Sequence, residues 1–106
     1  VAERAPRAAV VLTDGERGAW FRDADGGAVE HVPAWRVDAI EPTGAGDAFT
    51  AALLMRLADR GWGSPGLDDV RYAAAAGALA TTRPGAWDGL PTRAELDRFA
   101  ASDARA

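Results

Sequence analysis

The chain has 106 residues, 48% of them hydrophobic, which is enough sequence for one folded domain and too little for two. Its 12 basic and 16 acidic residues give a net charge of -4 without a basic run, which argues against a nucleic-acid-binding surface. With no Cys and a single His, the chain cannot form disulfides, Cys-based zinc sites or multi-histidine metal sites. Its longest apolar run is too short to span a bilayer.

The beginning of the sequence suggests a piece of a longer protein. Val1 is not an initiator Met, and no charged-then-apolar stretch resembles a signal peptide. An apolar run follows after only a few residues, which is unusual for a complete α/β protein. We therefore expect a fragment of a cytoplasmic protein.

The first half of the chain predicts β-structure. Residues 8–12 are apolar without alternation, which is typical of a parallel strand buried on both faces. Segments 19–22 and 28–32 flank the turn residues 25–27, which predicts a β-hairpin with one packed face. A further short strand is predicted over 35–40.

The second half predicts three helices. The first covers 47–60, is apolar nearly all round in its first two turns, which predicts burial there, and ends at Gly61. The second covers 67–82, and its small residues 73–80 favour close packing. The third, over 92–99, begins with a capping box.

The turn at 43–49 carries the chemistry, and its sequence is Thr-Gly-Ala-Gly-Asp-Ala-Phe. Gly44 and Gly46 let successive amides converge on an anion at the positive end of the following helix. The Asp47 carboxylate could then take a proton from a hydroxyl held beside that anion. The pattern fits neither a dinucleotide fingerprint nor a P-loop. These residues alone leave a second interpretation open, in which Asp47 caps the helix and the glycines only turn the chain.

Residues 41–49 resemble the second signature of the PfkB (ribokinase-like) family of sugar and nucleoside kinases, D-T-T-G-A-G-D-x-F, at all but its first two positions. The resemblance covers nearly the whole chain. It implies an α/β, ribokinase-like fold with Rossmann-like layers, here a C-terminal fragment with a β-hairpin and three helices. Residues 1–106 would then be the ATP-binding and catalytic part of the kinase domain, without the N-terminal substrate-binding and lid part.

The resemblance also implies roles for individual residues. Asp47 would be the general base for the acceptor hydroxyl. The anion hole for the transferring phosphoryl group would be formed by Gly44, Ala45 and Gly46. Segment 13–18 is similar to the family's T-x-G-x-x-G, which lines the ATP phosphate site, although such a glycine pair by itself is more often a simple turn. The implied nucleotide-binding residues are Thr13, Gly15, Gly18, Thr43, Gly44 and Gly46.

Segment 80–86 is similar to the family segment that borders the nucleotide base and a monovalent cation. The implied potassium ligands, most of them backbone carbonyls, are Glu41, Thr43, Ala80, Arg83 and Gly85. Oxygen ligands suit a hard cation. Glu41 and Pro42 stand where the family usually has Asp and Thr, so the match is weaker at the cation than at the anion hole.

The function implied by the resemblance is ATP-dependent phosphoryl transfer to a hydroxyl of a sugar or related small molecule, with Mg²⁺ and K⁺. The implied partner is a sugar or nucleoside, with no nucleic acid or membrane, and the full-length protein is a candidate homodimer. We expect the isolated fragment to be inactive because half of the site is missing. Two alternatives remain, a truncated non-catalytic nucleotide-binding fragment and an unrelated Rossmann-like binding module.

Three other features have structural explanations at this stage. His31 is expected to be a solvent-edge or nucleotide-adjacent side chain with no catalytic role. Asp68 and Asp69 are expected to complement the positive end of their helix. The four Trp residues are expected to pack in the core or at its rim.

Overall fold

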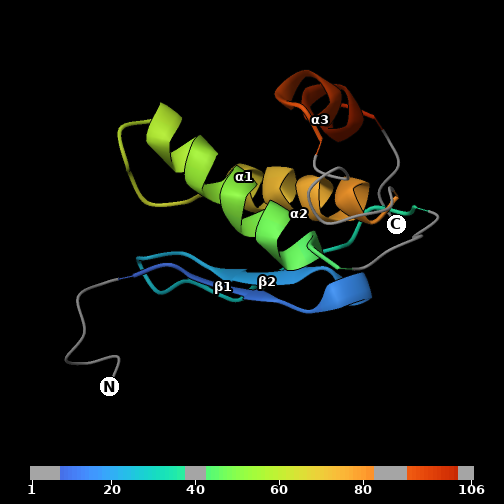
Figure 1. Ribbon diagram of the computed structural model, residues 1–106. Helices are drawn as coiled ribbons and strands as arrows, with labels where there is room; N and C mark the ends of the chain where they lie inside the picture. Colours follow the sequence, from blue (N-terminus) through green and yellow to red (C-terminus); the bar gives the residue numbers. More distant parts are fainter. Residues whose placement is uncertain (1–7, 38–42, 83–90, 103–106) are drawn as a thin grey trace.

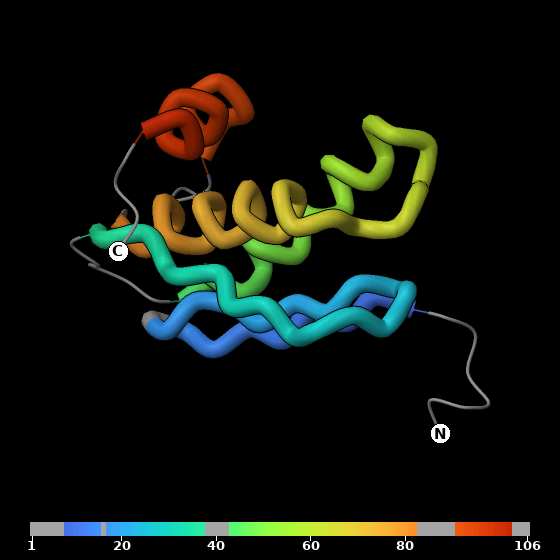
Figure 2. Tube along the Cα trace, turned by 180° about the vertical axis from the view of Figure 1, so that it is seen from behind, coloured from blue at the N-terminus to red at the C-terminus, as the bar shows by residue number. Residues whose placement is uncertain are grey.

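The computed structural model describes residues 8–37, 43–82 and 91–102. They form a small sheet, a layer of two helices on one of its faces, and a third helix beyond that layer (Figures 1 and 2). In chain order the elements are β1 (Val10–Thr13), the 3-10 turn η1 (Gly15–Arg17), β2 (Ala19–Arg22), β3 (Glu30–Val32), α1 (Ala45–Asp59), α2 (Leu67–Thr81) and α3 (Arg93–Ala100). The predicted α/β class, with a hairpin and three helices, is confirmed.

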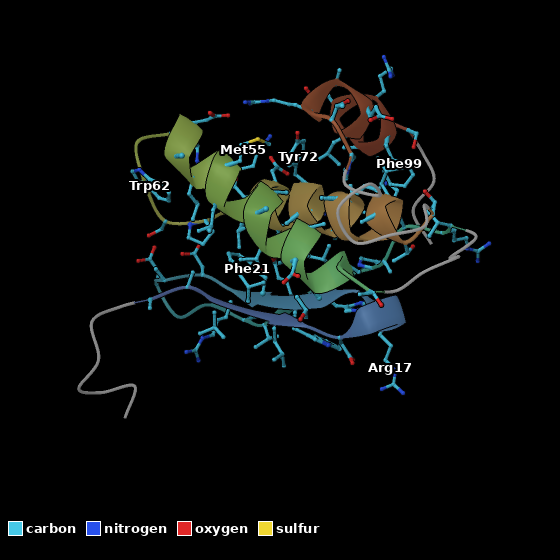
Figure 3. The ribbon with its side chains drawn as sticks, in the orientation of Figure 1. Arg17, Phe21, Met55, Trp62, Tyr72 and Phe99 are labelled. Carbon is cyan, nitrogen blue, oxygen red and sulfur yellow. The ribbon has the colours of Figure 1, made fainter. Side chains whose placement is uncertain are left out.

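The sheet is antiparallel, with strand order β1-β2-β3. The β2–β3 hairpin turns where the Gly26 N–H donates to the Asp23 carbonyl at 2.9 Å, with Gly26 at φ 80°. Phe21 points toward the helices and is buried, whereas its neighbour Trp20 is 40% exposed on the opposite face (Figure 3). The predicted hairpin and its single packed face are both confirmed.

The prediction for the first strand is wrong in two respects. β1 pairs antiparallel with β2 instead of lying in a parallel sheet. It is also not buried on both faces, because Val10 is 49% and Leu12 63% exposed. The described helices cover one face of the sheet, and among the described residues β2 is the only strand beside β1. Of the strand predicted over 35–40, residues 35–37 contain only an isolated β-bridge at Trp35, and the remaining residues lie outside the described ranges.

α1 ends as its sequence predicts. Gly61 adopts φ 76° and donates its N–H to the Ala58 carbonyl at 3.1 Å, while Trp62 N–H donates to Leu57 at 2.7 Å. These two bonds form a Schellman motif, which satisfies carbonyls at the end of the helix. The burial predicted for the first two turns is found on one side only, because Ala48, Phe49 and Ala52 are buried whereas Thr50 and Ala51 are exposed.

α1 and α2 pack closely where α1 begins and α2 ends. A Cβ built at Gly77 would lie 3.1 Å from the Ala45 carbonyl oxygen and 3.7 Å from the Phe49 Cβ. The run Ala73–Ala76 is buried as well. The close packing predicted for the small residues of α2 is therefore confirmed, and it brings the first turn of α1 against the last turns of α2.

α3 begins with the predicted capping box. Glu95 N–H donates to the Thr92 hydroxyl at 3.2 Å, and Thr92 N–H donates to the Glu95 carboxylate at 2.9 Å. The helix buries Leu96 against the core. The Tyr72 hydroxyl of α2 also donates to Asp97 at 2.6 Å, and burial together with this bond raises the pKa of Tyr72 to about 12. The hydroxyl therefore stays protonated at neutral pH and ties α3 to α2.

Two kinds of feature are missing from the described ranges. None of their helices combines the length and apolar character that crossing a membrane requires. Within residues 8–37, 43–82 and 91–102, no group of three or more His, Asp or Glu side chains is placed to hold a metal ion.

Candidate active site

The two segments predicted to bind phosphates lie at the same end of the molecule. Figures 1 and 2 show the beginning of α1 beside η1, from opposite directions. The last turn of α2 lies at this end too, because α2 runs antiparallel to α1. The fold thus brings the turn at 43–47, the loop at 13–18 and the end of α2 into one neighbourhood.

The turn before α1 has the geometry of an anion site. Gly44 is the N-cap in the left-handed region, with φ 90°, which glycine adopts without strain. The first helical bond runs from Ala48 N–H to the Gly44 carbonyl at 2.9 Å. The amides of Ala45, Gly46 and Asp47 precede that bond and have no acceptor within the helix. They sit at the positive end of a 15-residue helix, where a phosphate is favoured.

Gly46 is a glycine that the described fold does not require. Its φ lies outside the left-handed region, and a Cβ there would meet no atom within 4 Å. Gly18 is the opposite case, because it has φ 99° and its Cβ would lie 2.0 Å from the Val32 carbonyl oxygen. Packing therefore explains Gly18, whereas open space in front of the helix surrounds Gly46.

Asp47 lies in the first turn of α1 and is exposed. Within the described part of the chain its carboxylate takes part in no hydrogen bond or ion pair, and no side chain caps α1. The described residues therefore give no contact that would make Asp47 a structural cap. The carboxylate belongs to the same first turn as the three amides that have no acceptor within the helix, and in this place it can accept a proton from a bound hydroxyl.

The loop between β1 and β2 closes on itself and borders an open pocket. Asp14 N–H donates to the Gly18 carbonyl at 2.8 Å, and Arg17 N–H donates to the Asp14 carbonyl at 3.0 Å. The pocket is lined by Thr13, Asp14, Gly15 and Arg17. The Arg17 side chain points away from the helices (Figure 3), so the loop faces α1 with its backbone and not with this guanidinium.

Two of the predicted cation ligands lie within the described residues. Thr43 is exposed in the turn before Gly44, and Ala80 is in the last turn of α2. The hydroxyls of Thr81 and Thr82 donate to the carbonyls of Ala78 and Leu79 at 2.6 and 2.7 Å. Neither of these two hydrogen bonds uses the carbonyl of Ala80. Glu41, Arg83 and Gly85 lie outside the described ranges.

Two residues have larger roles than the sequence analysis assigned to them. His31 Nε2 lies 2.6 Å from the Arg17 carbonyl oxygen in the loop that borders the pocket. Asp69 is only 1% exposed and pairs with Arg56 at 3.1 Å and Arg60 at 2.6 Å. A sequence signal existed only for Asp69, which follows Gly66 at the spacing of a capping box and accepts its N–H at 2.8 Å.

Known proteins that are similar to this chain include sugar and nucleoside kinases. A fructokinase from Klebsiella pneumoniae is 41% identical over 92 residues, which cover 84% of this chain and 29% of that protein. The structure of aminoimidazole riboside kinase from Salmonella enterica, complexed with aminoimidazole riboside and an ATP analog, superposes with a TM-score of 0.76 and 36% identity. That match covers 89% of this chain and 32% of the kinase.

A fructokinase double mutant from Vibrio cholerae was solved with fructose, ADP and a potassium ion. It superposes with a TM-score of 0.70 at 38% identity, and the match covers 86% of this chain and 30% of the fructokinase chain. The chain thus spans about 30% of the length of these relatives. The family model described as pfkB family carbohydrate kinase matches residues 1–93. On this match, together with the ribokinase-like fold, the chain belongs to the PfkB family of carbohydrate kinases.

Proposed function

We propose that residues 1–106 are the ATP-binding and catalytic part of a kinase that transfers a phosphoryl group from ATP to a hydroxyl of a sugar or nucleoside. The family match and the substrates of the solved relatives support this class of reaction. The proposal places the reaction between the turn at 43–47 and the loop at 13–18, which lie side by side. Since ATP is the proposed co-substrate, we also propose a cytoplasmic location.

In the proposed reaction Asp47 removes the proton from the acceptor hydroxyl as its oxygen attacks the γ-phosphorus of ATP. The new phosphorus–oxygen bond forms while the bond to the β-phosphate oxygen breaks, and ADP leaves. The amides of Gly44, Ala45 and Gly46, of which the last two have no acceptor within α1, stabilise the charge on the transferring group together with the helix dipole. Mg²⁺, which accompanies ATP, supplies further charge neutralisation.

The loop between β1 and β2 is proposed to hold the phosphates of the nucleotide. Thr13, Asp14, Gly15 and Arg17 line the open pocket. Several amides of the loop are already bonded within it, so phosphate recognition here relies on the remaining backbone groups and the Thr13 hydroxyl. The proposed role is therefore to place the nucleotide, whereas the turn before α1 stabilises the transition state.

The observation that carries the proposal is Gly46, a glycine for which the described fold gives no reason. If a phosphoryl group approaches this backbone, Gly46→Ala places a methyl group in its path. We expect kcat to fall by about tenfold in a complete kinase that contains this chain. The unfolding free energy should stay level or rise by up to about 0.5 kcal/mol, because Ala favours helix over Gly. Steady-state kinetics and urea unfolding measure the two quantities.

Gly63→Ala is the matched control, since a Cβ at this exposed glycine also meets no atom within 4 Å and its φ is not positive. It should change neither turnover nor stability. Unaltered kcat in Gly46→Ala would contradict the proposed anion hole. A complete protein that binds ATP but phosphorylates no sugar or nucleoside would favour the non-catalytic nucleotide-binding alternative.

We further propose a potassium site that includes Glu41, Thr43, Ala80, Arg83 and Gly85. The turn before α1, which contains Thr43, and the last turn of α2, which contains Ala80, lie at the same end of the helix layer. The fructokinase double mutant from Vibrio cholerae was solved with a potassium ion. An ion bound there would order the turn that precedes the anion hole. Potassium should therefore raise turnover relative to sodium. Equal rates in potassium, sodium and large-organic-cation chlorides would remove the cation site from the proposal while leaving the kinase assignment in place.

A further inference from the structure

His31 connects the outer edge of the hairpin to the loop that borders the pocket. It lies on β3, and its Nε2 is 2.6 Å from the Arg17 carbonyl oxygen. A carbonyl only accepts, so the imidazole donates through its Nε2–H. Arg17 is the last residue of η1 and lines the pocket together with Thr13, Asp14 and Gly15. The pocket loop connects β1 and β2, and this bond attaches it to the third strand, β3.

The pairing of Thr13 with Ala19 fixes the two ends of the loop, its internal bonds set its shape, and the attachment to β3 adds to both. Asp14, Arg17 and Gly18 form backbone bonds within the loop. Two contacts described in the structure hold it against β3. One is the close packing of Gly18 on the Val32 backbone, and the other is the His31 bond. Of these two contacts, the His31 bond is the one made by a side chain.

The imidazole is itself held in place by Trp20. The two residues are directly opposite each other in the β2–β3 pair, with ring centroids 4.4 Å apart and planes tilted by 41°. A ring that packs on its cross-strand partner has fewer accessible orientations. The donor is therefore pre-arranged toward the Arg17 carbonyl, although both side chains lie on the exposed face of the sheet.

We infer that His31 is a positioning residue for nucleotide binding. It holds the pocket loop where the phosphates of ATP are received, and it touches neither the acceptor hydroxyl nor the transferring group. This inference rests on the proposed function, because it assigns the loop to ATP. Loss of the bond should weaken ATP binding and leave the chemical step intact.

Two variants distinguish the effect of the His31 hydrogen-bond donor from the effect of its aromatic ring. His31→Phe keeps a flat ring against Trp20 but has no donor, whereas His31→Gln keeps an N–H donor of similar reach. In a complete kinase that contains this chain, we expect His31→Phe to raise the KM for ATP by about fivefold. Its kcat and its KM for the sugar should stay within about twofold of the wild type. His31→Gln should restore most of the ATP affinity.

Hydrogen exchange of the loop provides a readout that does not need turnover. The Asp14 and Gly18 amides, bonded within the loop at 2.8 and 3.0 Å, should exchange faster in His31→Phe than in the wild type or in His31→Gln. An unchanged KM for ATP in His31→Phe, or equal impairment of both variants, would overturn the inference while the kinase assignment stands. A wild-type protein that neither binds nor consumes ATP would instead overturn the proposed function.

Discussion

Asp47→Asn is expected to lower kcat by about 100-fold or more in a complete kinase that contains this chain, with little change in nucleotide affinity. The substitution keeps the size of the side chain but removes the carboxylate that accepts the proton. Because Asp47 has no hydrogen bond or ion pair with the described residues, its replacement should hardly alter stability. Steady-state kinetics, nucleotide titration and urea unfolding test the three expectations together.

Asp68→Asn is the control for this experiment. Asp68 is also an aspartate in the first turn of a helix, and its side chain is 85% exposed, but it lies in α2 and outside the proposed site. Its substitution should leave kcat unchanged. Weakened nucleotide binding with unchanged kcat in Asp47→Asn would instead make Asp47 a structural or nucleotide-binding residue and contradict the mechanism.

Asp69→Ala is expected to have the largest effect on stability. The Asp69 carboxylate pairs with Arg56 and Arg60 of the preceding helix and its cap, and it accepts the Gly66 N–H at 2.8 Å. Its loss removes all three contacts from a buried position and leaves the Gly66 amide without this acceptor. Since Arg56 and Arg60 are 35% and 46% exposed, water can solvate them in part. We therefore expect a loss of about 2–3 kcal/mol in unfolding free energy.

The neighbouring variant Asp68→Ala gives the matched comparison. Asp68 forms only a surface pair with Arg71 at 3.6 Å, so its removal should cost within about 0.5 kcal/mol. Urea unfolding of both variants measures the difference. Equal losses would show that helix N-terminal charge, and not the buried network of Asp69, accounts for the effect.

Features that depend on neighbouring residues in the chain were predictable. Gly61 ends α1, and the Thr92–Glu95 capping box begins α3, because both signals act through backbone groups a few residues away. The motif at 43–49 likewise predicted the turn that precedes α1. Local chemistry dictates these features whatever the rest of the fold does.

Features that depend on distant partners were not predictable. An apolar run such as 8–12 is compatible with burial on either one face or two, and which of these occurs depends on the elements that cover the sheet. Asp69 finds Arg56 and Arg60 only because the turn after α1 folds back on it. His31 reaches Arg17 only through the register of the hairpin. None of these partners is specified by spacing along the chain.

The antiparallel packing of α1 and α2 gives this chain a natural labelling position. The loop between the two helices lies at the opposite end of α1 from Gly44, and 15 helical residues span about 22 Å. Gly63 in that loop is exposed and has open space around it. Because the chain contains no Cys, Gly63→Cys would provide a unique thiol for a spectroscopic probe. A fluorophore there could follow folding and nucleotide titrations from a position that does not touch the reacting groups.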